Sequence, residues 1–198
     1  MMSKIQSIKE TIGTKEFKRL NAYVEADDKM RDATKQNMLR TFTMLYYTGA
    51  RISELLQIKN VDIVSIIENQ ELIIISHKVK RERKIQFSET AVKAIAKLFA
   101  HSLKNEPKET FIIKSRGSVI LNKVPKISVY TNAVNKVIQD ALGDRHSSHD
   151  FRRGVLTEMA SKMVNPKIMQ SFIGHADIKT TMLYVNPSDL DIRAALVR

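Results

Sequence analysis

Apolar residues recur at helical spacing along most of this chain, and this pattern constrains the fold more than any other feature. After Thr14, a suitable N-cap, Phe17, Leu20 and Val24 lie three or four residues apart and so share one face of a helix. The same spacing predicts a second helix that ends at Gly49 and further helices over 53–58, 88–103, 128–142, 149–163 and 166–172, with short helical patches after 178. Such a chain must bury its apolar stripes between packed helices.

One stretch of the chain departs from the helical period. Between residues 61 and 87, polar turns separate three short segments rich in Ile and Val, namely 61–67, 71–76 and 84–87. Segments of this kind are typical of β-strands, and their closeness in sequence favours an antiparallel meander. We therefore expect a mainly α protein of the α+β class, a single helical domain with a small three-stranded antiparallel sheet.

The chain also has a large excess of positive charge. Its 198 residues include 33 Lys and Arg against 21 Asp and Glu, a net charge of +12. This excess favours a polyanionic partner, nucleic acid before an anionic membrane. The absence of cysteine excludes disulfide scaffolds, thiolate zinc sites and cysteine nucleophiles. No apolar run approaches the ~20 residues of a membrane span, and the first residues lack the apolar core of a signal peptide, so we expect a cytoplasmic protein without a membrane partner.

Two features in the first half of the chain could bind an anion. Arg51 follows Gly49 where a new helix is expected, and Glu54, three residues on, could orient it. Five of the seven residues from 78 to 84 are Lys or Arg. An Arg–Glu pair at a helix end is usually a surface ion pair, and a basic turn is usually solvated; the alternative for the turn is a finger that touches DNA phosphates.

The second half of the chain contributes histidines, an arginine and a tyrosine. His149 and Arg152 stand three apart at a helix start, so they share a face that would suit an oxyanion. Tyr184 follows His175 by nine residues, which on one straight helix would place the two on opposite faces. Asp177 is a suitable N-cap for a new helix between them, and the resulting bend would let both face one site. Each of these residues alone is more often structural.

Taken together, the order of these features resembles the tyrosine recombinase (phage-integrase) family. The resembling stretches are Thr-Gly-Ala-Arg-Ile-Ser-Glu-Leu-Leu at 48–56, the basic turn ending in Arg-Glu-Arg at 81–83, His-Asp-Phe-Arg-Arg at 149–153 and Phe-Ile-Gly-His-Ala-Asp-Ile-Lys-Thr-Thr-Met-Leu-Tyr at 172–184. Each motif by itself is weak. Five features in the family's order and at family-like intervals, from about residue 14 to the end, are specific.

The resemblance implies the fold of the family's catalytic domain and an enzymatic activity. A site-specific DNA recombinase, or integrase, of this kind cleaves and rejoins DNA strands through a 3′-phosphotyrosyl intermediate, with no metal ion, no ATP and no other cofactor. The implied partners are double-stranded DNA at the recombination sites of a mobile genetic element, further copies of the chain in a tetramer on DNA, and accessory DNA-bending proteins. The implied location is the cytoplasm, at the nucleoid.

The resemblance also assigns roles to residues of this chain. Tyr184 would be the nucleophile, and Arg51 and Arg152 would grip the scissile phosphate. His149 and His175 would assist by proton transfer and hydrogen bonding. The remaining implied residues are Lys78 as general acid for the leaving 5′-oxygen, Glu54 as support for the first arginine, and Lys80, Arg81, Arg83 and Arg153 as DNA contacts.

These residues suit the chemistry on physical grounds. Substitution at a phosphodiester adds negative charge, which fixed cations stabilise, and guanidiniums stay charged and can bind two oxygens each. A Tyr hydroxyl with a pKa of about 10 is a weak nucleophile until a base accepts its proton, and His149 is the natural base. The sequence has no clear carboxylate cluster for Mg²⁺.

The basic turn leaves the choice of the general acid open. Relatives often have Gly-Lys-Gly where this chain has His-Lys-Val at 77–79. The register from 81–83 favours Lys78, and Lys80 stays the alternative.

Domain organisation and two other functions remain open at this point. Residues 1–13 are expected to form a polar segment or linker, and residues 14–198 the catalytic domain. The family usually adds an N-terminal helical domain that clamps DNA, which this chain lacks; it is either an isolated catalytic domain or a naturally short recombinase. A type IB topoisomerase-like enzyme would use the same chemistry without partner exchange, but the short C-terminal spacing disfavours it. The other alternative is a DNA-binding or regulatory module that keeps the fold without cutting.

Overall fold

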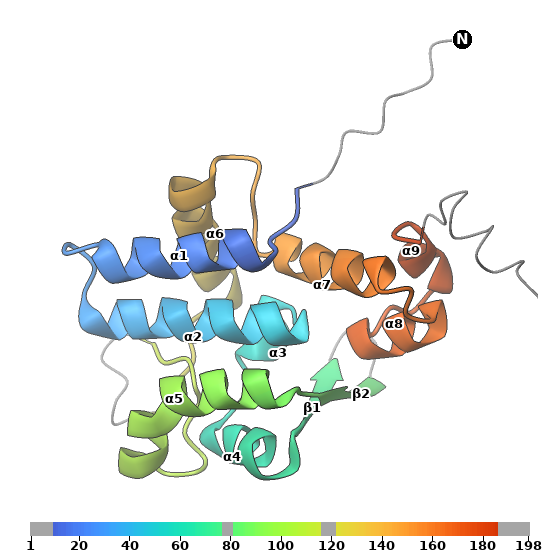
Figure 1. Ribbon diagram of the computed structural model, residues 1–198. Helices are drawn as coiled ribbons and strands as arrows, with labels where there is room; N and C mark the ends of the chain where they lie inside the picture. Colours follow the sequence, from blue (N-terminus) through green and yellow to red (C-terminus); the bar gives the residue numbers. More distant parts are fainter. Residues whose placement is uncertain (1–9, 77–80, 116–121, 186–198) are drawn as a thin grey trace, which may run out of the picture.

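The computed structural model describes residues 10–76, 81–115 and 122–185 of the chain. Within these ranges it consists of helices joined by short loops and one small β-hairpin, which confirms the expected mainly helical class (Figure 1). The helices are α1 (Thr14–Ala26), α2 (Asp32–Thr48), α3 (Ile52–Leu55), α4 (Asn60–Asn69), α5 (Glu89–Asn105), α6 (Ile127–Leu142), α7 (His149–Ser161), α8 (Pro166–Ile173) and α9 (Ile178–Met182), and the strands are β1 (Glu71–Ser76) and β2 (Arg81–Gln86). None of the helices so described is long and apolar enough to cross a membrane.

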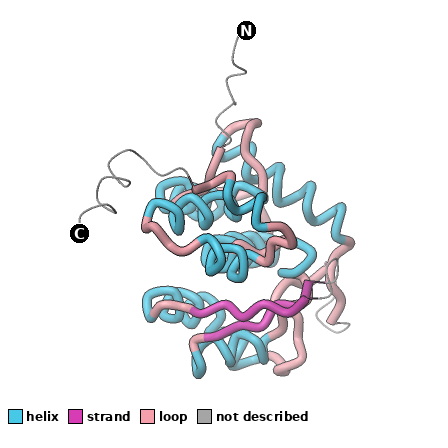
Figure 2. The backbone as a smooth tube through the Cα atoms, turned by 90° about the vertical axis from the view of Figure 1, so that its right-hand side faces the viewer, coloured by secondary structure: helices cyan, strands magenta, loops and turns pink. Residues whose placement is uncertain are grey.

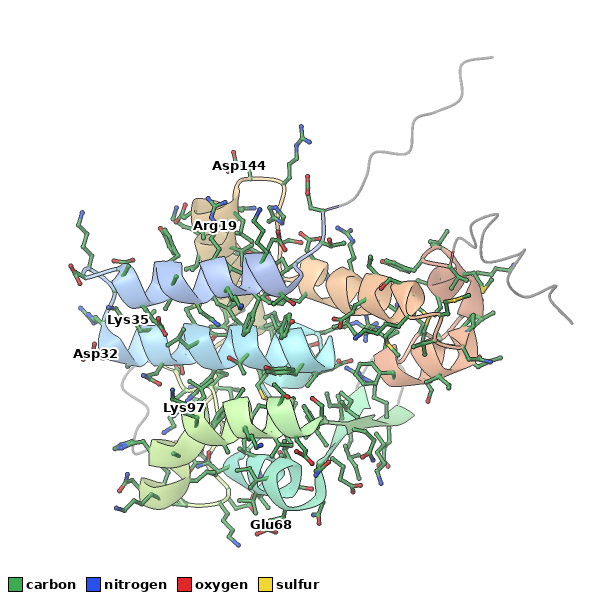
Figure 3. All side chains as sticks on the ribbon, in the orientation of Figure 1. Arg19, Asp32, Lys35, Glu68, Lys97 and Asp144 are labelled. Carbon is green, nitrogen blue, oxygen red and sulfur yellow. The ribbon has the colours of Figure 1, made fainter. Side chains whose placement is uncertain are left out.

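Helix α2 lies at the centre of the helical body. It packs against α1, α5 and α7, and α1 also contacts α6 (Figure 1). Its buried side chains lie on more than one face and include Thr41, Phe42 and Leu45. Phe42 stacks on Phe151 of α7, with ring centroids 5.8 Å apart. Charged side chains such as that of Arg19 point outward from this body (Figure 3). The packing on several sides makes α2 a rigid support for whatever stands at its C-terminal end.

Several later elements meet near the end of α2. Helix α7 packs along α2, α8 packs on both α7 and β2, and α9 packs on α8. Figure 2 turns this end of the molecule toward the viewer and shows the two strands running side by side at the edge of the helices. Helix α8 starts with the side chain of Asn165 as N-cap and Pro166 at its first position, and it ends at Gly174. Segments far apart in the sequence are thereby gathered at one end of the molecule.

The prediction of a first strand over residues 61–67 is wrong. Residues 61–67 lie in α4, which packs against α5. The β-branched residues of this segment resemble a strand in sequence, but Ile63 and Ile66, three residues apart, are the buried pair, as in a helix. Among the residues described, the sheet therefore has two strands rather than three, and they pair antiparallel with Ile74 opposite Arg83.

Part of the expected N-terminal segment is packed on the domain. The side chain of Ile12 is buried, and its backbone amide donates a hydrogen bond to the carbonyl oxygen of Asp150 at 3.0 Å. The backbone of Ile12 crosses α7 at Gly154, where an added Cβ would lie 2.1 Å from the Ile12 carbonyl oxygen. Residues 10–13 thus brace the first turns of α7.

Candidate active site

Five of the predicted site residues lie close together beyond the C-terminal end of α2. Arg51 precedes α3, His149 and Arg152 lie in the first turn of α7, His175 follows α8, and Tyr184 follows α9. The charges of Arg51 and Arg152 act on both histidines, and Tyr184, when ionised, would act on Arg152. We call these five residues the arginine–histidine cluster.

Glu54 holds Arg51 from inside the protein. Its Oε1 accepts a hydrogen bond from Arg51 Nη1 at 2.8 Å, and its Oε2 accepts one from the Arg51 backbone amide at 3.0 Å. The Glu54 side chain is 4% exposed and that of Arg51 is 30% exposed. Burial acts to raise the pKa of the Glu54 carboxyl, but the Arg51 amide and the guanidiniums of Arg83 and Arg51 outweigh burial and keep this pKa below its ordinary value. Glu54 is therefore a buried anion that orients a more accessible cation.

Arg152 is a buried cation with an unused donor. The residue is 7% exposed, and its Nη1 donates to the carbonyl oxygen of Gly49 at 3.0 Å. Its Nη2 is buried and has no hydrogen-bond partner among the described residues. Burial, with the charges of Arg51 and Arg83, lowers the pKa of Arg152 to about 9. A buried donor without a partner is rare in proteins, and an anionic oxygen placed beside Arg152 would satisfy it.

His175 is oriented by its neighbour in α9. Its Nδ1 lies 2.9 Å from Oγ1 of the buried Thr181, which leaves Nε2 as the ring atom that can serve a ligand. Burial and the guanidiniums of Arg152, Arg51 and Arg83 lower the pKa of His175 to about 4. The ring is therefore neutral at pH 7 in the free protein. Thr181 is a functional residue that the sequence patterns above did not single out, although the paired Thr residues of the motif offered a signal.

The lowered pKa of His175 predicts a loss of stability in mild acid. The ordinary pKa of this side chain is 6.5, so between pH 6.5 and pH 4 the ring binds a proton in the unfolded chain but not in the folded protein. The contribution of His175 to the free energy of unfolding is therefore fully present above pH 6.5 and is lost as the pH falls through about 4. We expect His175→Gln to make the free energy of unfolding less pH-dependent between pH 7 and 4.5, by about 1–2 kcal/mol after allowance for solvent screening. Urea unfolding at a series of pH values measures this.

His101, exposed on α5, provides the matched control for that titration. His101→Gln makes the same substitution outside the arginine–histidine cluster, and it should change the pH dependence of unfolding less than His175→Gln does. If His175→Gln and His101→Gln behave alike, His175 titrates as an ordinary histidine and the described surroundings of its ring are wrong.

His149 is the first residue of α7, and Arg153 lies about one helical turn further on. Partial desolvation of the ring, with the charges of Arg153, Arg152 and Arg51, lowers the pKa of His149. This imidazole is thus neutral at pH 7 and can accept a proton. Arg153, expected to contact DNA, donates through Nη1 to the buried carboxylate of Asp150 at 2.5 Å, and its side chain is 30% exposed. Asp150 therefore holds the Arg153 guanidinium at the surface beside His149.

Tyr184 faces the cluster because the chain bends after His175. The side chain of Asp177 caps α9 and accepts a hydrogen bond from the backbone amide of Lys179 at 2.9 Å, as the sequence predicted. Tyr184 is partly buried against the apolar group that includes Met169 and Ile173. Its negative form would raise the pKa of Arg152, which places its hydroxyl within electrostatic reach of that guanidinium. The bend at Asp177 thus brings a tyrosine to the same site as the two arginines.

Arg83 was expected to contact DNA, and this expectation is wrong because the side chain is buried. It is 4% exposed and forms an ion pair with Glu54 at 3.0 Å. On β2, Arg83 and Ile85 lie on the buried face, while the residue between them is exposed. A side chain on this face cannot reach a phosphate outside the domain. The alternation of Arg83 with Ile85 and Phe87 is a sequence signal that could have shown this.

Three more predicted site residues belong to the same basic stretch of the sequence as Arg83. Lys78 and Lys80 lie outside the described residues, and Arg81 begins β2. The roles of all three stay predictions.

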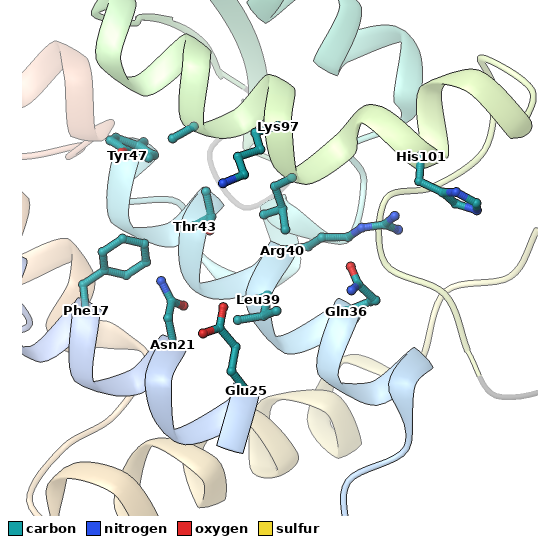
Figure 4. Close-up of a pocket in the computed structure, with 12 residues that line it drawn as sticks. Phe17, Asn21, Glu25, Gln36, Leu39, Arg40, Thr43, Tyr47, Lys97 and His101 are labelled. Atoms are coloured by element: carbon teal, nitrogen blue, oxygen red, sulfur yellow. The ribbon is translucent and has the colours of Figure 1, made fainter. Parts of the chain in front are cut away.

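A cavity lies away from the arginine–histidine cluster. Its volume is about 650 Å³, and it lies between α1, α2 and α5, with Asn21 and Glu25 on one side and Lys97 on the other (Figure 4). None of the predicted site residues that the structure describes lines it. Across residues 10–76, 81–115 and 122–185, no three His, Asp or Glu side chains are grouped as metal ligands.

Comparison with known proteins points to one family. The profile of the phage integrase family matches residues 10–190 of the chain. The tyrosine recombinase XerC of Caldanaerobacter subterraneus subsp. tengcongensis is 29% identical over 168 residues, which cover 82% of this chain and 44% of that protein. The chain spans about half the length of the curated relatives it matches.

Solved structures share the fold at low sequence identity. The crystal structure of XerA recombinase matches with a TM-score of 0.69 and 20% identity, over 98% of this chain and 65% of that chain. The Tn1549 transposon integrase in complex with transposon right end DNA matches with a TM-score of 0.71 and 20% identity, over 98% of this chain and 67% of that chain. The helical body and its hairpin are thus those of this group of structures.

Proposed function

The chain belongs to the phage integrase family, and its relative XerC is a tyrosine recombinase. We therefore propose that the chain is a site-specific DNA recombinase that cleaves and rejoins DNA strands. The observation that carries the proposal is the arginine–histidine cluster. It holds two guanidiniums beside two neutral imidazoles and a tyrosine, and one guanidinium has a buried donor that no described residue pairs. The anionic oxygens of a phosphodiester can accept hydrogen bonds from these donors.

The two arginines would bind the scissile phosphate. Arg152 offers its Nη2, which has no partner within the described part of the chain, and Arg51 is the more exposed cation, held by Glu54. Substitution at phosphorus builds up negative charge on the non-bridging oxygens, and preorganised cations in a partly dry site stabilise that charge strongly. Because Glu54 and the Gly49 carbonyl already orient both guanidiniums, little reorganisation would be needed when DNA binds.

Tyr184 would be the nucleophile. Its hydroxyl oxygen attacks phosphorus, the hydroxyl proton passes to neutral His149, and the bond between phosphorus and the 5′-oxygen breaks. The leaving 5′-oxygen takes a proton from Lys78, while Nε2 of His175 donates to or accepts from a phosphate oxygen according to its tautomer. The product is a 3′-phosphotyrosyl link and a free 5′-hydroxyl, and attack by a 5′-hydroxyl on that link rejoins the strand.

The bond exchange is balanced without an external energy source. The phosphodiester energy stays in the phosphotyrosyl link, so ATP is not needed, and the guanidiniums supply the positive charge that a metal ion provides in other phosphoryl-transfer enzymes. We therefore propose a metal- and ATP-independent reaction. The net charge of +12 supports duplex DNA as the substrate, bound at the nucleoid.

The assembly and the domain limits belong to the same proposal. Residues 14–198 would form the catalytic domain, with residues 10–13 braced against α7. Strand exchange joins two duplexes, and each duplex is cut at two positions, so four copies of the chain would assemble on DNA. Accessory DNA-bending proteins would take part where the recombination site requires them.

Covalent trapping tests this function. Labelled duplexes from the ends of the host element, nicked beside the cleavage position so that the short 5′-hydroxyl piece is lost, are mixed with the protein in EDTA. We expect an adduct that survives SDS, because religation is prevented and no metal is required. A four-way junction intermediate in the same reaction would distinguish recombination from topoisomerase-like relaxation.

Each other outcome of the trapping experiment contradicts part of the proposal. Binding to the same DNA without an adduct indicates the non-cutting DNA-binding module. An adduct that EDTA removes and Mg²⁺ restores contradicts metal independence while leaving the tyrosine chemistry intact.

A further inference from the structure

The Arg83 guanidinium joins three segments that are far apart in the sequence. Its Nη2 donates to Glu54 Oε2 at 3.0 Å. Its Nη1 donates to the carbonyl oxygen of Phe172 at 2.5 Å and lies 3.4 Å from that of Thr48. Thr48 ends α2, Glu54 belongs to α3, and Phe172 lies in the last turn of α8. One buried side chain of β2 therefore connects the ends of α2 and α8 with α3.

The turn that presents His175 rests on Arg83. Gly174 ends α8 in the left-handed region, with φ of 70°, and immediately precedes His175. A Cβ at Gly174 would lie 2.9 Å from Cδ of Arg83, so the arginine stem fills the space beneath the turn. The bond from Arg83 to Phe172 fixes the same turn from the other side. The position of the His175 ring thus depends on where Arg83 lies.

Glu54 divides its two carboxylate oxygens between two guanidiniums. Oε1 binds Arg51, whereas Oε2 binds Arg83 and the backbone amide of Arg51. Without Arg83, a carboxylate that is 4% exposed would lose one of its two cationic partners. It would then rotate more freely and take up a proton more readily, and in both cases it would hold Arg51 less firmly.

We propose that Arg83 is a positioning residue for strand cleavage, which sets Arg51 through Glu54 and His175 through the α8 turn, so that both groups face the same phosphate. This inference rests on the proposed recombinase function. A buried ion pair is weak evidence for stability, but it suits the task of holding groups in one geometry. In enzymes, a misplacement of about 1 Å at a reacting group can cost ~10²-fold in rate.

Arg83→Met tests the proposal, because it removes the guanidinium and keeps an unbranched stem. We expect single-turnover cleavage of the nicked duplex to slow about 10–100-fold, and DNA affinity to change by less than about 3-fold, since the Arg83 side chain is buried. The acid limb of the rate against pH should move to higher pH, because the lost cation lets both Glu54 and His175 take up a proton earlier. Arg83→Lys keeps the positive charge but lacks the planar guanidinium with its several donors. Its cleavage rate should lie between those of the wild type and Arg83→Met.

Arg40→Met is the matched control. Arg40 is also a buried arginine bonded to a backbone carbonyl, that of Ile112 at 3.1 Å, but it lies outside the arginine–histidine cluster. We expect its loss to lower the unfolding temperature and to leave the cleavage rate and pH profile unchanged when assayed below that temperature.

A purely structural role for Arg83 has a distinct signature. If Arg83→Met folds and keeps the wild-type rate and pH profile, the proposal is wrong. If Arg83→Met does not fold, Arg83→Lys decides: a wild-type rate and profile overturn the proposal, and a slower rate at unchanged affinity supports it.

A second readout does not depend on cleavage. In the free protein, NMR titration of the His175 ring should show a midpoint that Arg83→Met moves up toward 6.5 and Arg40→Met leaves in place. An unmoved midpoint in Arg83→Met overturns the proposal. Absence of an adduct with the wild-type protein counts against the recombinase function, and the titration still shows whether Arg83 acts on His175.

Discussion

Tyr184→Phe is expected to abolish the SDS-resistant adduct while leaving DNA affinity within about 2-fold of the wild type, since it removes only the hydroxyl that would attack phosphorus. The ring would still pack against Met169 and Ile173, so the fold should be kept. Loss of a covalent nucleophile in other enzymes costs on the order of 10⁴–10⁶-fold in rate, which here means no adduct on a gel. Denaturing gels with the nicked duplex, beside a binding assay on the same DNA, measure both quantities.

Tyr23→Phe is the matched control for the nucleophile. Tyr23 lies on α1, is 37% exposed and belongs to neither the arginine–histidine cluster nor its supports. Its variant should form the adduct at the wild-type rate. Should Tyr184→Phe still form an adduct, another residue attacks the phosphate and the assignment of the nucleophile fails.

Arg152→Ala is expected to slow cleavage by about 10²–10³-fold, the usual effect of removing one preorganised donor to a developing oxyanion. The reason is the unpaired Nη2, which in the free protein has no partner among the described residues and so is available to a phosphate oxygen. DNA affinity should fall far less, because the excess positive charge is spread over the chain. Arg152→Lys keeps a charge but cannot bind the Gly49 carbonyl and a phosphate with one rigid fork, so its rate should remain well below that of the wild type.

A neutral substrate separates the charge of Arg152 from its packing. With a methylphosphonate at the scissile position, one anionic oxygen is absent, and the defect of Arg152→Ala should shrink by about tenfold or more. Arg19→Ala, at an exposed position of α1, provides the control for a general loss of positive charge and should cleave normally. An equal defect on charged and neutral substrates would show that Arg152 acts only through the fold.

Local sequence patterns predicted the parts of the site that depend on local geometry. Glu54 lies three residues after Arg51, and that spacing alone brings the two side chains together on one helical turn. In the same way, Asp177 as an N-cap forces the bend that lets His175 and Tyr184 share a site. Such relations span fewer than ten residues, so backbone geometry settles them with little help from the rest of the molecule.

The order of the motifs also gave the family, which the profile match over residues 10–190 bears out. It did not give the roles of the site residues, which stay proposals until the variants above are measured. Nor did it show the unpaired Nη2 of Arg152, because an orphaned donor is a property of the packed interior.

Two sequence expectations failed for a common reason. Residues 61–67 have the composition of a strand but form α4, because Ile63 and Ile66 are buried as a helical pair in a body where α4 packs on α5. Arg83 stands in a basic stretch that predicts DNA contact, but its side chain turns inward to Glu54. The composition of a segment is compatible with more than one secondary structure and side-chain orientation. The elements that pack against the segment decide which of these it adopts.

By itself the sequence determined the helical class, the family and the short-range pairs of the site. The tertiary structure alone decided which distant groups come into contact at the site: Arg152 with Gly49, and Arg83 with Glu54 and Phe172. These contacts join residues that are 103, 29 and 89 positions apart. The physical reason is the separation along the chain. The backbone of one helix fixes the relation between residues three or four positions apart, whereas contacts between residues far apart in sequence form only when the whole core has packed.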